Sequence, residues 1–288
     1  MTNKTYRSAA DFRRALEDRL QEIAKREAVD LQRIRREVAF DRLLIRLFHG
    51  QQPEKLPWAL KGGYAMELRI QAARATKDID LTVRLASTAA VVNDLLQKLQ
   101  KFAAVDIGDF FVYMIGEPIA DLDAAPYGGS RFPVEARIDG RTFVKFHLDA
   151  GIGDARIEPL EAIKGRNWLQ FAGISNESIY MIPREQQFAE KLHAYTLPRV
   201  ATLNSRVRDL VDMVLLIRSN TLNAAKTLDA IHITFACRKN HTLPDPLPPP
   251  PADWERPFAA LAQECGLKIG PEDAYFSVSN FLTTLPER

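Results

Sequence analysis

Two short runs decide the fold of this chain: KGGYAMELR at residues 61–69 and RATKDIDL at residues 74–81. Glycine lacks a Cβ, so the pair at 62–63 lets backbone N–H groups approach a phosphate closely. Asp78 and Asp80 are two residues apart, which places both carboxylates on one side of an extended strand. Carboxylate oxygens are the ligands that Mg²⁺ prefers. Together the two runs favour a site for a nucleoside triphosphate and its metal ion.

The residues around these runs predict a strand, a turn, a helix and a second strand. An apolar run at 58–60 ends at the glycine pair, and residues 64–71 have the pattern of a short helix. Apolar residues at 79, 81 and 83 alternate with the two acids, which is typical of a strand. An ordinary tight turn and exposed strand acids would give the same pattern, so both alternatives stay open here.

A predicted β-hairpin supplies a third carboxylate. Residues 132–138 and 141–149 read as its strands, because the Asp-Gly pair between them is a strong hairpin turn. Every second residue of the later strand is apolar, which places Asp149 on the face away from the core. With the two acids of the first runs it would form a three-carboxylate cluster suited to two-metal nucleotidyl transfer. His147 shares that face, but we interpret it as a structural histidine.

The chain changes character near residue 175, where mixed helices and strands give way to helices. A proline-rich connector at 243–251 interrupts the helical part. We therefore predict a mixed α/β architecture with a core of residues 1–175 that includes the N-terminal helices. Residues 176–288 are predicted to form a helical domain that completes an active-site cleft with the core.

Three charged residues of the helical part are candidates for chemistry. Lys191 lies beside an apolar stripe, so it either extends along that surface or neutralises a β- or γ-phosphate. Asp209 and Asp212 are three residues apart, so they share one helix face near the start of a helix. Asp209 could pair with Lys191 and hold it in place.

Composition excludes several classes of protein. Hydrophobic residues make up 46% and charged residues 26% of 288 residues, as in a folded soluble protein. No apolar stretch approaches the roughly 20 residues that cross a bilayer, and residues 1–7 lack a signal-peptide core. The two cysteines are far apart, which argues against a zinc site or a disulfide scaffold. We expect no membrane association and a cytoplasmic location.

Basic residues are concentrated near the N-terminus, where the first fifty residues hold twelve Lys and Arg against eight Asp and Glu. The arginines could form a phosphate-facing surface or a solvated helix face compensated by neighbouring acids. They are Arg33, Arg35, Arg36, Arg42 and Arg46.

Several segments resemble the AbiEii/AbiGii-type nucleotidyltransferase toxins, and within that family the mycobacterial MenT-type toxins. The resemblance covers most of residues 60–255. It is carried by the two opening runs, QFAEKLHA at 187–194, RVRDLVD at 206–212, and FACR at 235–238 followed by a proline-rich turn and Trp254.

The resemblance implies a minimal nucleotidyltransferase fold of the DNA polymerase β superfamily with a C-terminal helical domain. It implies an NTP donor and Mg²⁺, with a two-metal site and Mn²⁺ as an alternative ion. It also implies transfer of NMP to the 3′ end of tRNA with release of pyrophosphate, which would block translation. A cognate antitoxin is the implied partner.

By motif match, the resemblance also implies roles for individual residues. The residues that it assigns to nucleotide binding are Lys61, Gly62, Gly63, Arg74, Thr76, Lys191 and Arg238. Asp78 and Asp80 would hold metal, with Asp149 added by the strand pattern. Lys191 and one of the acids Asp209 and Asp212 would be catalytic with the strand acids. Gly63 departs from the superfamily, which often has Ser there, and the gap before Asp78 is longer than in many members.

Three functional hypotheses follow. In the first, the chain is a tRNA-modifying toxin, and the arginines at 33–46 together with Arg238 bind RNA phosphates. In the second, a nucleotidyltransferase of the same fold modifies a small molecule or a protein. In the third, the chain is a non-catalytic interaction protein, for which removing Asp80 would change no phenotype.

Overall fold

The structure is a computed structural model that describes residues 6–84, 91–122, 125–198 and 206–286. The chain divides into two compact units. The first comprises Met1–Leu60, Thr76–Gly153 and Glu161–Met181, and the second comprises Lys61–Ala75, Asp154–Leu160 and Ile182–Arg288. The sequence prediction placed one boundary at residue 175. In the structure, the short segments at 61–75 and 154–160 group with the later helices.

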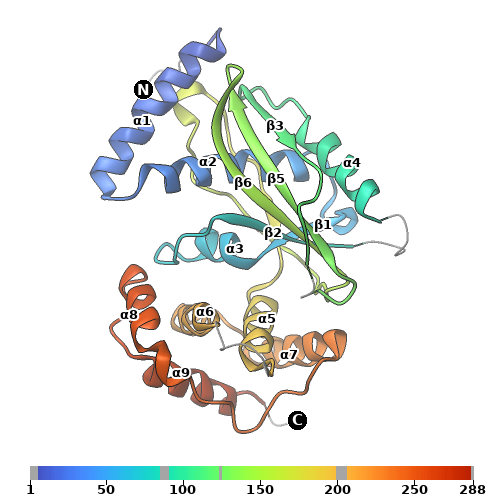
Figure 1. Cartoon of the computed structure of the whole chain (residues 1–288), viewed down its shortest axis with the longest axis vertical. Coiled ribbons are helices and arrows are strands. Elements are labelled where there is room, and N and C mark those ends of the chain that lie inside the picture. The colour runs from blue at the N-terminus through green and yellow to red at the C-terminus, as the bar shows by residue number, and fades with distance from the viewer. Residues whose placement is uncertain (1–5, 85–90, 123–124, 199–205, 287–288) are drawn as a thin grey trace. The chain divides into compact units, whose positions relative to one another are not determined.

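The first unit is built on a mixed eight-stranded sheet with the order β3-β5-β6-β2-β1-β8-β7, and β4 pairs with β5 (Figure 1). Pairs β1–β8 and β2–β6 are parallel, whereas β3–β5, β5–β6 and β7–β8 are antiparallel. The strands are β1 (Trp58–Lys61), β2 (Asp78–Val83), β3 (Phe111–Ile115), β4 (Ala120–Asp121), β5 (Gly129–Ile138), β6 (Arg141–Ile152), β7 (Glu161–Ile163) and β8 (Ile179–Met181).

Helices of the first unit pack on this sheet. They are α1 (Ala9–Glu27), α2 (Leu31–Phe48) and α4 (Val91–Ala103), with short 3-10 turns at Pro53–Lys55 and Gln170–Ala172. Side-chain oxygens cap the first two helices, Ser8 accepting from the Asp11 backbone N–H and Asp30 from that of Arg33. Helix α2 packs against β6 and β8, and α4 against β3, so their apolar faces build the core with one face of the sheet.

The predicted β-hairpin is confirmed as β5 and β6. Asp139 and Gly140 form its two-residue turn with φ values of 56° and 66°. Turns of this kind need positive φ at both central positions, which Asp tolerates and Gly adopts freely. The alternation predicted for β6 also holds, because Phe146 and Leu148 are buried in the core.

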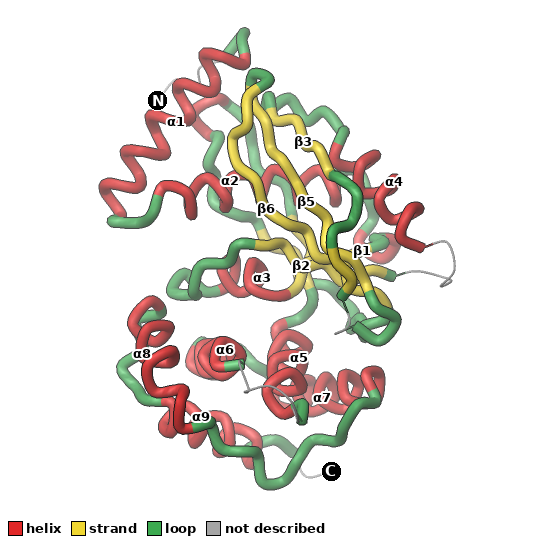
Figure 2. Tube along the Cα trace, viewed as in Figure 1, coloured by secondary structure: helices red, strands yellow, loops and turns green. Residues whose placement is uncertain are grey.

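The second unit is helical, and its described residues from 182 onward form helices joined by loops (Figure 2). Its elements are α3 (Gly62–Arg69), α5 (Arg184–Thr196), α6 (Val207–Arg218), α7 (Ala224–Arg238), a 3-10 turn at Ala252–Trp254, α8 (Glu255–Glu264) and α9 (Pro271–Thr283). Helix α5 packs on α6 and α7, and α6 on α8 and α9. Their apolar residues form one core, which includes Phe188, Leu210 and Phe258. The predicted mixed α/β class with a helical C-terminal part is confirmed. Across the described residues, none of the helices has the length and apolar character to cross a membrane.

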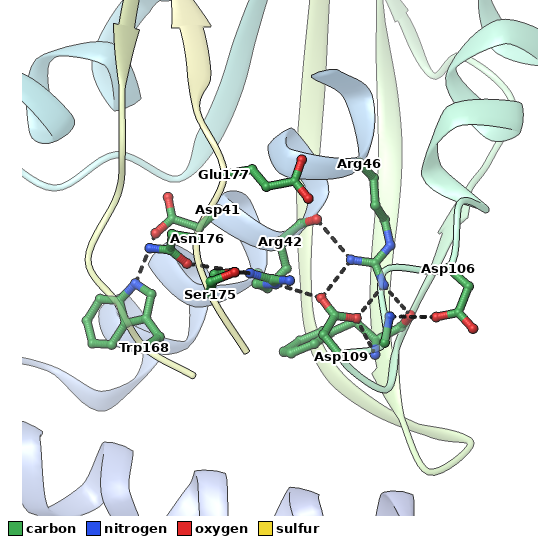
Figure 3. A network of polar contacts seen from close by, with 12 residues as sticks. Asp41, Arg42, Arg46, Asp106, Asp109, Trp168, Ser175, Asn176 and Glu177 are labelled. Carbon is green, nitrogen blue, oxygen red and sulfur yellow. Dashed lines mark hydrogen bonds and ion pairs between the residues drawn. The ribbon is translucent and has the colours of Figure 1, made fainter. Parts of the chain in front are cut away.

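Both interpretations of the N-terminal arginines are wrong for Arg42 and Arg46, which are each 1% exposed. Their guanidinium groups converge on Asp109, with Arg42 Nε 2.6 Å from Oδ2 and Arg46 Nη1 2.8 Å from the same oxygen (Figure 3). Arg46 also donates to the carbonyls of Arg42 and Phe111. A buried arginine needs such partners because an unpaired charge in the core is very costly. These two arginines are therefore structural.

Two arginines in the first turns of the same helix form ion pairs within the protein. Arg33 pairs with Glu37 at 3.0 Å, and Arg35 pairs with Glu17 of α1. These ion pairs agree with the interpretation of a helix face compensated by neighbouring acids.

Candidate functional site

The paired acids lie on one face of β2, as the sequence predicts. Ile79 and Leu81 are fully buried, whereas Asp78 and Asp80 are half-buried on the opposite face. Alternation along a strand has this effect because successive side chains point to opposite faces of the sheet.

Strand register aligns these acids with charged residues of β5 and β6. In the strand register, Asp80 of β2 lies opposite Asp149 of β6, and Asp149 lies opposite Arg131 of β5. The three residues therefore form one row across three strands. Asp78 pairs with His147 in the adjacent row. Side chains at directly paired positions lie about 5 Å apart at Cβ and interact. The sheet therefore gathers three carboxylates, one guanidinium and one imidazole.

Arg131 is the main partner of Asp149. Its Nε lies 2.8 Å from Oδ1 and its Nη2 lies 2.7 Å from Oδ2 of Asp149, while Nη2 is 3.7 Å from Oδ2 of Asp78. Hydrogen bonding to Asp149 raises the pKa of Arg131 above its ordinary value. His147 Nδ1 lies 3.2 Å from Oδ1 of Asp78, so this histidine pairs with the first strand acid.

The carboxylates fit a metal site only in part. Asp78 and Asp80 offer hard oxygen ligands on one face of β2, which suits Mg²⁺. Within the described ranges, no three His, Cys, Asp or Glu side chains are grouped so that they could hold a metal ion. Asp149 has both oxygens bound to Arg131. The three carboxylates share one face of the sheet with Arg131 bound to Asp149, and a metal role for Asp149 stays a prediction.

In the second unit, Lys191 lies between the two predicted acids of α6. Its Nζ is 2.8 Å from Oδ2 of Asp212 and 3.1 Å from Oδ1 of Asp209. The predicted pairing of Lys191 with Asp209 is therefore present. Burial by itself would lower the pKa of Lys191, but the two carboxylates outweigh it and raise the pKa above its ordinary value. The ammonium group is held charged.

Asp212 is the centre of this cluster. Its side chain is 0% exposed, and Arg74 donates to it from Nε at 3.2 Å and from Nη2 at 3.0 Å. Burial alone would raise the pKa of Asp212, yet Lys191 and Arg74 together hold it below its ordinary value. Arg74, which the motif match assigns to nucleotide binding, is thus a buried partner of Asp212.

The glycine pair lies at the junction between β1 and α3. Gly62 has φ of 68°, a left-handed conformation that favours glycine, and Gly63 is buried in the first turn of α3. Gln187 of α5 donates to the Gly62 carbonyl at 2.8 Å and accepts from Arg69. A side-chain amide thereby fixes the backbone of the turn.

Lys61 and Arg238 meet at a residue that sequence reasoning missed. Asp154, whose side chain is 2% exposed, accepts from Lys61 and from Arg238 Nε and Nη2 at 3.0 and 2.8 Å. Burial opposes the charged forms, but Lys61 and Arg238 still hold the pKa of Asp154 below its ordinary value. No sequence signal marked Asp154, because it lies in a loop with no motif.

The structure thus sorts the predicted residues into separate clusters. Asp78, Asp80 and Asp149 come together with Arg131. Lys191, Asp209, Asp212 and Arg74 form a second cluster, and Lys61 with Arg238 forms a third. Thr76 is half-buried in the connection before β2.

One solved structure that resembles the chain is MenT4, a nucleotidyltransferase toxin from Mycobacterium tuberculosis H37Rv. It is 16% identical, the match covers 87% of this chain and 92% of that one, and the TM-score is 0.48. A second is a proposed nucleotidyltransferase from H. pylori, 15% identical over 88% of this chain and 97% of that one, with a TM-score of 0.41. No curated protein matches the chain in sequence.

A family model gives the decisive match. The model describes the nucleotidyl transferase AbiEii toxin of type IV toxin–antitoxin systems, and it matches residues 42–276. This segment contains both opening runs, the hairpin and the helices that carry Lys191 and Asp212. Because the family model matches most of the length of this chain, the chain belongs to the AbiEii family of nucleotidyltransferase toxins.

Proposed function

We propose that this AbiEii-family chain transfers NMP from an NTP to the 3′ end of tRNA and so blocks translation. In the reaction, the oxygen of the acceptor hydroxyl gives up its proton to solvent and bonds to the α-phosphorus, while the bond from the α-phosphorus to the bridging oxygen breaks and pyrophosphate leaves. The observation that carries the proposal is the pair Asp78 and Asp80 on one face of β2, in a chain that belongs to a nucleotidyltransferase family.

Mg²⁺, or Mn²⁺ in its place, is the proposed cofactor, held by Asp78 and Asp80. Such an ion neutralises the triphosphate and lowers the pKa of an attacking hydroxyl. The half-buried position of the two acids supports this role, because they are accessible to solvent and share the sheet face with the carboxylate of Asp149.

Lys191 is proposed to contact a phosphate of the nucleotide. Its support is electrostatic: two carboxylates keep the ammonium charged and fix its position, so it is preorganised for an anion. Asp212 and Asp209, which are both buried, would together orient Lys191. We propose that Asp212, the more buried and more fully paired acid, is the essential one.

The glycine turn and the cluster at Asp154 are proposed to contribute to nucleotide binding. The Gly62–Gly63 backbone is free of Cβ atoms, and Lys61 and Arg238 add positive charge. For Arg74 the proposed role is indirect, because its guanidinium is bound to Asp212. Thr76 is proposed to lie near the nucleotide by motif match alone.

The proposed partners follow from the family and from the proposed acceptor. A cognate antitoxin would control the toxin, as in the type IV systems that name the family. NTPs and tRNA occur in the cytoplasm, which is therefore the proposed location.

Incubation of the purified chain with each α-labelled NTP, total RNA and total protein tests the proposal. We expect label in RNA of tRNA size, at the 3′ end by sequencing, and no label with Asp80→Asn. Label found only in protein or in a small molecule would contradict the tRNA acceptor. Unchanged labelling by Asp80→Asn would contradict the assigned site.

A further inference from the structure

Arg131 places a permanent positive charge among the carboxylates of the first unit. Its guanidinium binds both oxygens of Asp149, at 2.8 and 2.7 Å, and lies 3.7 Å from Asp78. Arginine stays protonated in proteins, and its planar fork matches a carboxylate through two parallel hydrogen bonds. The geometry is therefore that of a strong, oriented ion pair.

A metal ion and Arg131 compete for the same carboxylate. A divalent cation on Asp149 would lie a few ångströms from the guanidinium, and like charges at that distance repel strongly. It would also have to displace two charge-assisted hydrogen bonds. Asp149 is thus a poor metal ligand while Arg131 is in place.

The charges of the cluster support the same conclusion. The carboxylates of Asp78, Asp80 and Asp149 contribute three negative charges and the Arg131 guanidinium one positive charge, a sum of two negative charges. One divalent cation balances that charge. The Arg131 side chain is 35% exposed, so its charge also stays accessible to an anionic substrate.

We propose that Arg131 takes the place of a second metal ion at this site. It holds Asp149, and a single divalent cation binds through Asp78 and Asp80. The inference rests on the proposed function, and it replaces the expected two-metal site by one metal ion and one guanidinium. Arg131 is then a positioning residue that also supplies fixed charge.

The number of bound ions tests this inference without any assay of activity. The purified full chain is titrated with Mn²⁺, and the free ion is measured by electron paramagnetic resonance. We expect one bound Mn²⁺ for the unchanged chain and two for Arg131→Met, which keeps most of the aliphatic stem and removes the charge. Adding Asp149→Asn to Arg131→Met should return the number to one.

Arg137→Met is a matched control. Arg137 lies six residues further along β5, is similarly exposed at 37%, and pairs with Glu135 instead of the cluster. The Arg137→Met variant should therefore bind one Mn²⁺ ion, like the unchanged chain. Thermal midpoints of all variants show whether they fold. If Arg131→Met does not fold, the ion count of the Asp149→Asn single variant tests the inference. This variant should still bind one ion, because Asp149 is already bound to Arg131 and is not a metal ligand.

Two results would overturn the inference. The first is the same number of bound ions in the unchanged chain and in Arg131→Met. The second is that the unchanged chain binds two ions and the Asp149→Asn variant binds one. In that case a metal ion would displace Arg131 from Asp149, and Arg131 would be only a counter-ion of the empty site. Asp80→Asn separates the two proposals: it should abolish binding. An ion count that Asp80→Asn leaves unchanged refutes the proposed site and, with it, the role of Arg131.

Discussion

Lys191 of α5 and Asp212 of α6 form a buried ion pair with 2.8 Å between Nζ and Oδ2, and Arg74 closes it from the other side. The Asp212 carboxylate is fully buried, and burial alone would disfavour its charged form. The two neighbouring cations compensate for this and keep it ionised. This arrangement makes Asp212 both a support of the helical core and the residue that orients the lysine.

Asp212→Asn should destabilise the second unit far more than Asp209→Asn. Removing the Asp212 charge leaves Lys191 and Arg74 buried with one carboxylate fewer, which costs about 3–5 kcal/mol. Asp209 is also buried, with its side chain 7% exposed, but Lys191 keeps Asp212 as a partner when Asp209 is changed, so the loss should be smaller, about 1–2 kcal/mol. Urea unfolding at neutral pH measures both. Equal losses for the two variants would contradict the central role of Asp212.

Asp78→Asn and Asp80→Asn should abolish nucleotide transfer while leaving the thermal midpoint within a few degrees of the unchanged chain. Both acids are half-buried, and Asn has nearly the shape of Asp and can still accept a hydrogen bond, for example from His147 at position 78, so either change costs little packing. Transfer activity and a thermal scan are measured on the same preparation. A large drop in the midpoint with full activity per folded molecule would show that these acids are structural.

Asp109→Asn should destabilise the first unit by about 3–5 kcal/mol, because it leaves the guanidinium groups of Arg42 and Arg46 buried without a compensating charge. Asp106→Asn, in the adjacent exposed loop, is the control and should cost less than about 1 kcal/mol. Urea unfolding of the two variants makes the comparison. A stable Asp109→Asn variant with weakened RNA binding would contradict the structural role of Arg42 and Arg46 and would indicate that these arginines contact RNA phosphates.

His193 should make stability fall as the pH is lowered. Burial and then Arg238 lower its pKa to about 4 in the folded chain, against about 6.5 when unfolded. Between these values the unfolded chain binds the extra proton, so folding stability is complete above about pH 6.5 and is lost toward pH 4. The loss attributable to His193 should reach about 3 kcal/mol, from 1.36 kcal/mol per pKa unit.

The contribution of His193 is isolated by comparing the unchanged chain with His193→Gln. An amide can replace the contact of the imidazole with Asn240, which is 3.2 Å from Nε2, but it does not titrate. The unfolding free energy of the unchanged chain minus that of His193→Gln should fall by about 3 kcal/mol as the pH falls from 7 to 4. A constant difference over this range would show that His193 does not titrate as described.

Much of the local structure could be predicted because it depends on neighbouring residues. The alternation that places Asp78 and Asp80 on one face of β2 is a property of any strand. The Asp139-Gly140 turn is equally local, since it needs only residues that accept positive φ. Helix periodicity likewise places Asp209 and Asp212 on one face of α6, whereas their pairing with Lys191 depends on the packing of α5 against α6.

The burial of Arg42 and Arg46 could not be predicted in the same way. Their partner Asp109 is more than sixty residues away, and nothing in helix α2 distinguishes a buried arginine from an exposed one. The cluster at Asp154 was missed for the same reason, because its members come from three distant segments.

The sequence by itself determined which face of β2 carries the acids and which residues turn the hairpin, since strand alternation and turn conformation are local. Only the tertiary structure decided what Asp149 does. The hairpin turn pairs Ile138 with Arg141, a register that would place Ser130 opposite Asp149. An irregularity near Ala136 and Arg137 shifts the register by one residue and brings Arg131 there instead. A single extra residue in the ladder thus gives the third carboxylate a guanidinium partner.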